Sequence, residues 1–438
     1  MNLHRSSLRM FFAGCLLAFS ASAQAALEIT ITEGVVGARP IAVVPFQWEG
    51  EGRAPLDMAG VVDENLARSG EFSPVERSDL ISRPGMDDDV RYGNWRAIDT
   101  DHLVVGGIRR DGDRYQIRFR LFDVLAERQL TGYSFTANEN ALRRVAHEIS
   151  DIVFEEITGD RGAFSTRIAF VTREGSGDDR RNTLQIADYD GHNGRSVLES
   201  QHPIMSPAWS PDGERLAYVS FENDRRPAVF VHDVRSGERR RVSDRVGINS
   251  APAWSPDGER LAITLSHEDS PSIYVVRADG SGSPRRVTHG GAIDTSPAWT
   301  PDGDELVFTS DRAGNPQIYR TRADGRGQVH RLTFDGRYNA APDVSPDGER
   351  IAFVHRTDNG HYRVAVQDLD GGSTRVLTNG RSDDSVSFAP NGRMILYSTR
   401  HDGRDVLGAV SVDGRAEARL EQTAGNVRDP AWGPFRDD

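Results

Sequence analysis

Lysine is absent from this 438-residue sequence, so all 53 of its basic residues are arginines. They are outnumbered by 66 acidic residues, and the formal net charge at pH 7 is −13. A surface with such an excess of negative charge repels phosphate backbones. We therefore expect no nucleic-acid partner.

Cysteine is almost as scarce. The single cysteine, Cys15, lies in an N-terminal stretch that has the features of a secretory signal. Two arginines and a short apolar run, Met10 to Phe19, precede the small-residue cleavage site Ala23-Gln24-Ala25. We predict that residues 1–25 are a signal peptide cleaved after Ala25, with cleavage after Ala23 as the alternative. The mature chain would then contain neither a disulfide nor a thiol nucleophile.

Long apolar runs and catalytic motifs are also missing. The run from Met10 to Phe19 is too short to span a bilayer, and no other stretch approaches it, so we expect no membrane insertion. The sequence has no Gly-x-Ser-x-Gly, no His-Glu-x-x-His and no Cys/His metal spacing. His147-Glu148 lies on a predicted helix without a partner histidine, and we expect it at the surface. These absences predict a protein that is not an enzyme.

What the second half of the sequence does contain is a repeat. Copies of Pro-Ala-Trp-Ser-Pro-Asp-Gly and its variants place their turn prolines 45, 45, 45 and 44 residues apart, at Pro211, Pro256, Pro301, Pro346 and Pro390. A partial copy, DPAWGPF, starts at Asp429. Each period reads as four short strands with a Pro-Asp-Gly turn and a second Gly turn, which is typical of a β-propeller blade.

The two ends of the repeat predict how the propeller closes. Arg167 to Val171 matches the second strand of a blade without a first strand before it, and Pro430 to Gly433 matches a first strand without a second. Pairing them would give six blades and leave no free sheet edge. We therefore predict a mainly β chain with a six-bladed β-propeller over residues 164–438. The repeated tryptophans Trp209, Trp254, Trp299 and Trp432 would lie between blades.

Residues 26–160 carry no repeat and predict a small α/β domain. A buried strand at 39–46, a helix at 57–68, a hairpin at 102–122 and an amphipathic helix at 140–157 are its elements. The segment Ala26 to Gly37 alternates like a strand that either pairs with this domain or lies free.

Several motifs narrow the choice of family. The run RPIAVVPFQW ending at Trp48, GAFSTRIA at 162–169, DYDG at 188–191 and the repeats together resemble the TolB family over the whole mature chain. The resemblance implies a monomeric periplasmic component of the Tol-Pal system that supports outer-membrane integrity and envelope constriction in cell division. Its implied partners are the Pal lipoprotein, TolA and other envelope proteins. A peptidase with a similar propeller would need the Gly-x-Ser-x-Gly elbow that is missing here.

The resemblance also implies where the partners bind. Pal would contact the propeller face near the central channel, on loops that lead into each first strand. The implied residues are Met205, Asn249, Ser250, Ala251, Asp294, Thr295, Asn339, Asp383, Asp384 and Arg428. TolA would bind the mature N-terminal arm, residues 26–37, through Ala26, Leu27, Glu28, Ile29, Thr30 and Ile31.

The loops differ between repeats while the flanking motif does not, which fits either a functional rim on a scaffold or plain variable surface loops. We expect no cofactor. Because Asp294, Asp383 and Asp384 bring carboxylates toward the channel, Ca²⁺ there is an open alternative to a solvated acidic rim.

Overall fold

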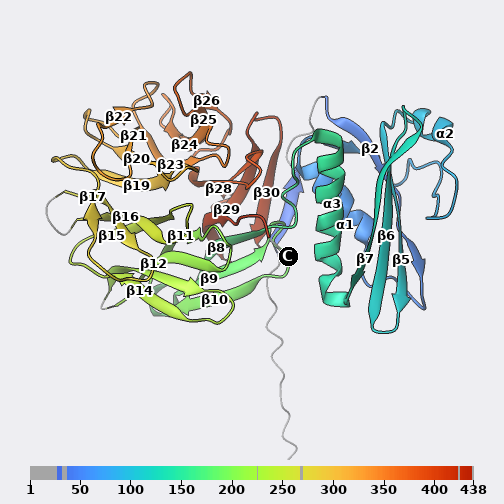
Figure 1. Ribbon diagram of the computed structural model, residues 1–438, viewed down its shortest axis with the longest axis horizontal. Coiled ribbons are helices and arrows are strands. Elements are labelled where there is room, and N and C mark those ends of the chain that lie inside the picture. The colour runs from blue at the N-terminus through green and yellow to red at the C-terminus, as the bar shows by residue number, and fades with distance from the viewer. Residues whose placement is uncertain (1–26, 32–36, 224, 267–269, 423–424, 437–438) are drawn as a thin grey trace, which may run out of the picture.

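The computed structural model describes residues 27–31, 37–223, 225–266, 270–422 and 425–436. It contains a β-propeller and a smaller α/β domain side by side (Figure 1). This confirms the predicted fold class. The predicted signal peptide and Ala26 lie outside the described residues. No helix within the described ranges is long and apolar enough to cross a bilayer.

The N-terminal domain is a six-stranded mixed sheet with two long helices packed on one face. The main strand order is β4-β2-β5-β6-β7, with β2 parallel to β4 and β5, β3 parallel to β5, and β5, β6 and β7 antiparallel. The strands are β2 Arg39–Val43, β3 Gln47–Glu49, β4 Phe72–Pro74, β5 His102–Asp111, β6 Arg114–Asp123 and β7 Arg128–Ala137. The helices are α1 Met58–Arg68, α2 Tyr92–Arg96, η1 Glu139–Ala141 and α3 Leu142–Thr158.

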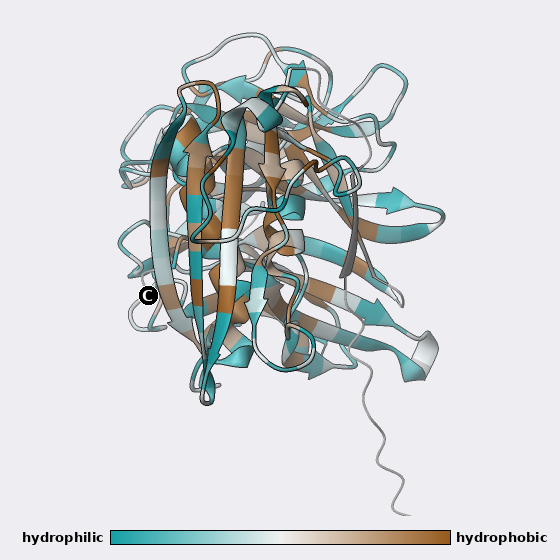
Figure 2. Cartoon of the chain, turned by 90° about the vertical axis from the view of Figure 1, so that its right-hand side faces the viewer, coloured by the Kyte–Doolittle hydropathy of each residue, from teal (hydrophilic) through white to brown (hydrophobic). Residues whose placement is uncertain are grey.

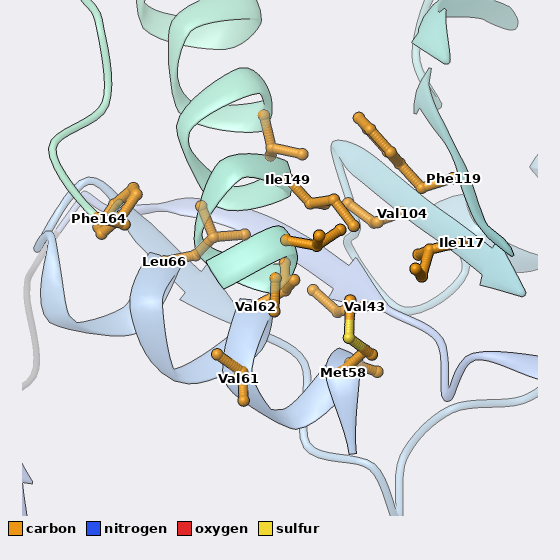
Figure 3. Packing of buried hydrophobic residues seen from close by; sticks show 14 of the residues in the cluster. Val43, Met58, Val61, Val62, Leu66, Val104, Ile117, Phe119, Ile149 and Phe164 are labelled. Carbon is orange, nitrogen blue, oxygen red and sulfur yellow. The ribbon is translucent and has the colours of Figure 1, made fainter. Parts of the chain in front are cut away.

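Local signals explain where the two long helices begin and end. The Asp57 carboxylate accepts a hydrogen bond from the Gly60 amide at 3.0 Å and caps α1. Gly159, with φ of 81°, ends α3 in the left-handed conformation that glycine adopts without strain. Apolar residues of both helices, among them Leu66 and Ile149, pack on the sheet and form the core of the domain (Figure 3). In Figure 2, hydrophobic and hydrophilic bands alternate along the long strands, as expected of a sheet with one face on this core.

The propeller has six four-stranded blades, numbered here from the composite one. Blade one has the order β10-β9-β8-β31, and its strands are β8 Arg167–Glu174, β9 Arg181–Asp188, β10 Arg195–Ser200 and β31 Asn426–Trp432, with η2 at Gly177–Asp179. Blade two is β11 Ile204–Trp209, β12 Arg215–Asn223, β13 Arg226–Asp233 and β14 Arg239–Ser243. Blade three is β15 Asn249–Trp254, β16 Arg260–Leu265, β17 Ser272–Arg277 and β18 Arg285–Arg286.

Blade four is β19 Asp294–Trp299, β20 Glu305–Ser310, β21 Gln317–Arg322 and β22 His330–Arg331. Blade five is β23 Asn339–Val344, β24 Arg350–Arg356, β25 Tyr362–Asp368 and β26 Arg375–Val376. Blade six is β27 Asp384–Phe388, β28 Met394–His401, β29 Arg404–Ser411 and β30 Glu417–Gln422. Because β31 pairs antiparallel with β8, the composite blade closes the ring as predicted.

The N-terminal arm adds a fifth strand to blade six. Strand β1, Leu27–Ile31, pairs antiparallel with β30, with Leu27 opposite Gln422 and Ile31 opposite Ala418. The expectation that the arm pairs with its own domain or lies free is therefore wrong, since the arm belongs to the propeller sheet. The edge of β30 offers unpaired backbone groups, and the arm satisfies them.

A polar joint connects the two domains. The Asp188-Tyr189-Asp190-Gly191 turn of blade one reaches α1 and α3, where the Tyr189 hydroxyl donates to Asn65 Oδ1 at 2.6 Å. Asp190, with 0% of its side chain exposed, accepts from Arg143 Nη2 at 2.5 Å. His147 lies in the same joint and is 1% exposed, so the expectation that it lies at the surface is wrong. The Nδ1 atom of His147 lies 3.0 Å from Nδ2 of Asn65.

Candidate functional site

The candidate site is the propeller face at which the first strand of every blade begins, called here the rim face. The first strands are β11, β15, β19, β23, β27 and β31, each entered by a loop from the preceding blade. All ten residues implied for Pal contact lie on or directly beside the starts of these strands. Their side chains divide into a buried group and an accessible group.

Four of the ten side chains are buried and have partners within the chain. Asn249, Asp294, Asn339 and Asp383 occupy the same repeat position, and each is at most 1% exposed. Asn249 ties down its own loop, donating to the Arg245 carbonyl at 2.7 Å and accepting from Ser243 Oγ at 2.6 Å. Asn339 likewise donates to the Asp335 carbonyl at 2.8 Å. At these positions the side chain fixes the shape of the rim from inside.

The two buried carboxylates of this group are held differently. Both oxygens of Asp294 accept from Arg312 Nη2, at 2.8 and 3.0 Å, which forms a salt bridge inside blade four. Asp383 accepts from Thr378 Oγ1 at 2.5 Å and Thr399 Oγ1 at 2.6 Å. Burial raises the pKa of Asp383, although both hydroxyl donors oppose the rise. Arg312 therefore already neutralises the charge of Asp294, whereas Asp383 accepts from uncharged hydroxyl groups.

The accessible residues of the ten are Met205, Ser250, Ala251, Thr295, Asp384 and Arg428. Arg428 is half-buried and pairs with Asp405 at 2.5 Å. Ala251 has a φ of 49°, and the residue before the proline, or before Val386 in blade six, has a φ between 49° and 56° in every blade. A β-bulge accompanies this backbone conformation in each first strand. Ala251 therefore contributes a backbone shape to the rim rather than a distinctive side chain.

The rim face also exposes apolar side chains that the motif comparison did not single out. Five residues at the starts of blades two to five are 39% to 75% exposed, namely Met205, Val246, Ile248, Ile293 and Phe334. Only Met205 was among the expected residues. The other four lie in short loops that are otherwise polar, and an apolar residue in such a loop is the signal that could have identified them. Exposed apolar groups gathered on one face are typical of protein-binding surfaces.

A hollow of about 560 Å³ opens on the rim face between blades four, five and six. It brings together three of the expected residues, Thr295, Asp383 and Asp384. Ile293 and two aromatic residues complete its apolar part, and the rings of Tyr338 and Tyr362 meet edge to face with centroids 5.4 Å apart. The hollow thus combines apolar walls with carboxylates from blades four and six, which suits a polypeptide segment with both apolar and polar groups.

One potential metal cluster occurs among the described residues, away from the rim. Donor atoms of His147, Asp188 and Asp190 lie within 4.8 Å of one another. The Asn65 amide donates to Ser150 Oγ at 2.8 Å, so its nitrogen also faces His147 Nδ1. With Nδ1 accepting, the proton of the neutral ring lies on Nε2, which faces Asp190. A protonated Nε2 cannot ligate a metal, so these residues belong to the polar joint.

The pKa shifts of His147 and Asp190 agree with the assignment of these residues to the polar joint. Burial lowers the pKa of His147 to about 4, so the ring is neutral at pH 7. Burial also works to raise the pKa of Asp190, but His192, His147 and Arg143 together hold it below the usual range. The joint is therefore an ionised carboxylate paired with arginine beside a neutral histidine.

Comparisons with known proteins agree with both domains. Residues 27–130 match the TolB amino-terminal domain family, and residues 154–436 match the TolB beta propeller domain family. The Tol-Pal system protein TolB of Thioalkalivibrio sulfidiphilus is 59% identical over 436 residues, covering 99% of this chain and 98% of that protein. TolB of Nitrosococcus oceani is 59% identical over 421 residues, covering 95% and 96%.

The fold is also similar to a solved TolB. The crystal structure of TolB from Acinetobacter baumannii is 38% identical and superposes with a TM-score of 0.87, covering 93% of this chain and 100% of that chain. Two family models, near full-length relatives and a solved structure thus agree on both domains and their order. The chain belongs to the TolB family of Tol-Pal system proteins.

Proposed function

We propose that this protein is a periplasmic protein-binding component of the Tol-Pal system that binds the Pal lipoprotein through the rim face and TolA through the N-terminal arm. In this role it supports outer-membrane integrity and envelope constriction during cell division. The relatives that are 59% identical are named as Tol-Pal system proteins, and this supports membership of the system. The absence of catalysis, the absence of a cofactor and the monomeric state stay predictions.

The exposed apolar residues of the rim face carry the Pal proposal. Large apolar side chains scattered singly over a surface need no explanation, but here five gather at the starts of four consecutive blades. The hollow between blades four and six adds a concave site beside them. Interface centres are enriched in methionine and aromatic residues, and the rim supplies Met205, Phe334 and Tyr338.

The buried residues of the rim have a supporting role in this proposal. Hydrogen bonds of Asn249 and Asn339 fix the loops that present Ile248 and Phe334, so less loop entropy is lost when a partner binds. We therefore assign direct contact to Met205, Thr295, Asp384 and their apolar neighbours. Asn249, Asp294, Asn339 and Asp383 act as positioning residues.

The test is calorimetric titration of the mature protein with the soluble domain of Pal from the same organism. Ile293→Asp and Phe334→Asp place a charge in the apolar surface and should weaken binding by at least about tenfold. Leu125→Asp is the matched control, because Leu125 is 64% exposed but lies in the N-terminal domain. Thr295→Arg places a large side chain in the hollow, so it tests whether the hollow itself takes part in binding Pal.

Each outcome is informative. Loss of binding in the rim variants with a normal Leu125→Asp control supports the proposal. Tight binding of Pal that no rim variant changes would support Pal as the partner but refute the rim face as its binding surface. An intact, folded protein that does not bind Pal at all would refute the Pal proposal.

For TolA, the arm supplies a strand that pairs through its backbone with β30. Strand addition is a general mode of peptide recognition, and a strand at a sheet edge can exchange one partner for another. Removing residues 26–31 should abolish TolA binding and leave Pal binding in place. Undiminished TolA binding by the shortened protein would refute the assignment of the arm.

A further inference from the structure

A second concave site lies away from the rim face, between the N-terminal domain and blades five and six. Its volume is about 550 Å³, within the range of pockets that hold small organic ligands. Arg68 and Glu71 line it from the N-terminal domain, Arg350 and Val366 from blade five, and Leu396 and Leu420 from blade six. Domain interfaces are preferred places for such pockets.

Arg350 is the feature of this cavity that the repeat makes unusual. The residues at its repeat position in blades one, two and three are Arg167, Arg215 and Arg260, and each guanidinium stacks over the tryptophan of the next blade at 4.7 to 5.1 Å. Arg167 and Arg215 also donate to a glycine carbonyl of the next blade, at 2.8 and 3.2 Å. These arginines serve the seams between blades.

The seam between blades five and six lacks this arrangement. Phe388 replaces the tryptophan of blade six. Among the described residues, the Arg350 guanidinium makes no hydrogen bond to the next blade and stacks over no ring, but its charge helps to lower the pKa of Asp347 in the preceding turn, and Asp368 stands opposite it in the sheet register. Arg350 is half-buried and lines the cavity. A change of one aromatic residue thus leaves this guanidinium without the indole of the next blade over which its counterparts stack.

The rest of the lining complements this cation with apolar surface. Phe154, Phe164, Trp432 and Leu396 contribute apolar walls. Five arginines line the cavity against three carboxylates, Glu71, Asp368 and Asp413. Of these arginines, Arg68, Arg393 and Arg415 form salt bridges with carboxylates, Arg375 donates to the Val412 carbonyl, and Arg350 interacts with Asp347 without forming a salt bridge. The cavity therefore combines apolar walls with a local excess of positive charge, in a chain whose net charge is −13.

We propose that the interdomain cavity binds a small organic anion with an apolar body, such as a medium-chain fatty acid, with Arg350 holding the acidic head group. A guanidinium binds a carboxylate through two parallel hydrogen bonds, and a partly buried site strengthens them. The aliphatic body lies against the apolar walls and contributes through burial of its surface. The site is independent of the proposed Pal surface, which lies on the rim face.

The test uses decanoate as the anionic probe and decanol as its uncharged counterpart, each titrated into the whole mature protein by calorimetry. We expect saturable one-to-one binding of decanoate, with decanol at least about tenfold weaker. Arg350→Gln should weaken decanoate binding by about tenfold and leave decanol binding unchanged. Because the Arg350 guanidinium forms no salt bridge or hydrogen bond in the described part of the chain and interacts only more weakly with Asp347, this variant should fold normally. The matched control is Arg114→Gln, an exposed arginine in β6.

A steric variant tests the position of the site separately. Ser373 is exposed and lines the cavity, so Ser373→Trp should block both probes. Ser283→Trp, in the corresponding turn of blade three, should leave both titrations unchanged. The absence of saturable decanoate binding to the wild-type protein would overturn the proposal. Wild-type affinity in folded Ser373→Trp would overturn the location, and wild-type affinity in Arg350→Gln would overturn the role of Arg350.

Discussion

Single residues at the blade seams show how the ring tolerates departures from its repeat. In three seams a tryptophan Nε1 donates to an alanine carbonyl of the preceding blade, from Trp209, Trp254 and Trp299 at 3.3, 3.1 and 3.1 Å. Blade six has Phe388 instead, and its backbone amide donates to Asp343 Oδ2 of blade five at 2.8 Å. A carboxylate thus replaces an indole as the connection between neighbouring blades.

The Asp343 connection predicts a pH dependence of stability. Burial raises the pKa of Asp343 to about 6, above the usual 3.8, although two backbone amides oppose the rise. Between about pH 4 and pH 6 the folded protein retains a proton that the unfolded chain has lost, so this residue makes the free energy of unfolding fall as pH rises. The fall is about 3 kcal/mol and is complete above about pH 7.

Asp343→Asn removes this contribution. The free energy of unfolding of the variant, relative to that of the wild type, should therefore be higher at about pH 7 than at about pH 4. Urea unfolding of both proteins at about pH 4 and about pH 7 measures this change. If the difference in free energy between the two proteins were the same at both pH values, the raised pKa of Asp343 would be contradicted.

The family resemblance implied Pal contact for Asn249, Asp294, Asn339 and Asp383, whose side chains the structure buries. The same repeat position holds Ile204 and Val427 in blades two and one, at 3% and 0% exposure. Those two apolar residues were the available sign that the position faces inward. The sequence did not indicate which loop groups would satisfy the buried amides and carboxylates.

At the scale of the strand, the bulge on the rim face predicts an unusual response to glycine. Ala251 has a φ of 49°, which costs a non-glycine residue roughly 1–2 kcal/mol. Ala251→Gly relieves this strain and raises the entropy of the unfolded chain by an opposing 0.5–1 kcal/mol or so. The variant should be as stable as the wild type or up to about 1 kcal/mol more stable. Ala253→Gly, two residues further in the same strand, should be about 1 kcal/mol less stable. Denaturant unfolding of both variants measures these differences. If Ala251→Gly were less stable than Ala253→Gly, the proposed strain at Ala251 would be contradicted.

Pairing of the arm with blade six is a feature that local sequence could not reveal. Alternation in residues 27–31 predicts a strand, but the partner strand β30 begins at Glu417, at the opposite end of the chain. The partner edge exists because β30 is the outermost strand of blade six, and local sequence does not indicate which distant edge the arm reaches. The repeat, in contrast, predicted blade number and closure because every unit carries the same turn residues.

Removal of the arm should therefore have a local effect. Without residues 27–31, the outer edge of β30 loses its hydrogen-bond partners, and the amides of β30 should exchange with deuterium faster. The outer strand of blade two, β14, pairs only with β13 among the described strands and serves as the internal control. Unchanged exchange in β30 would show that the arm does not occupy this edge in solution.

At the scale of the whole molecule, the polar joint makes the two domains one unit. Asp190 is fully buried and paired with Arg143, so Asp190→Asn leaves the half-buried guanidinium without its carboxylate. Breaking a buried pair in this way costs about 3–5 kcal/mol. Calorimetry should then resolve separate unfolding of the N-terminal domain and the propeller. Glu214→Gln, which breaks an exposed pair with Arg235, should change stability by less than about 1 kcal/mol. One cooperative transition in Asp190→Asn would contradict the role of the joint.

Ring closure by β31 also has a consequence for the order of events during synthesis. Every other strand of the propeller leaves the ribosome before Asn426–Trp432, the segment that β8 needs as its partner. Blades two to five contain only strands that are consecutive in the chain, but the ring stays open until β31 is available to pair with β8. An open ring is more easily pulled apart than a closed one, because its two terminal sheets still have free edges. This timing suits a protein that we propose crosses a membrane as an extended thread and acquires its final shape on the far side.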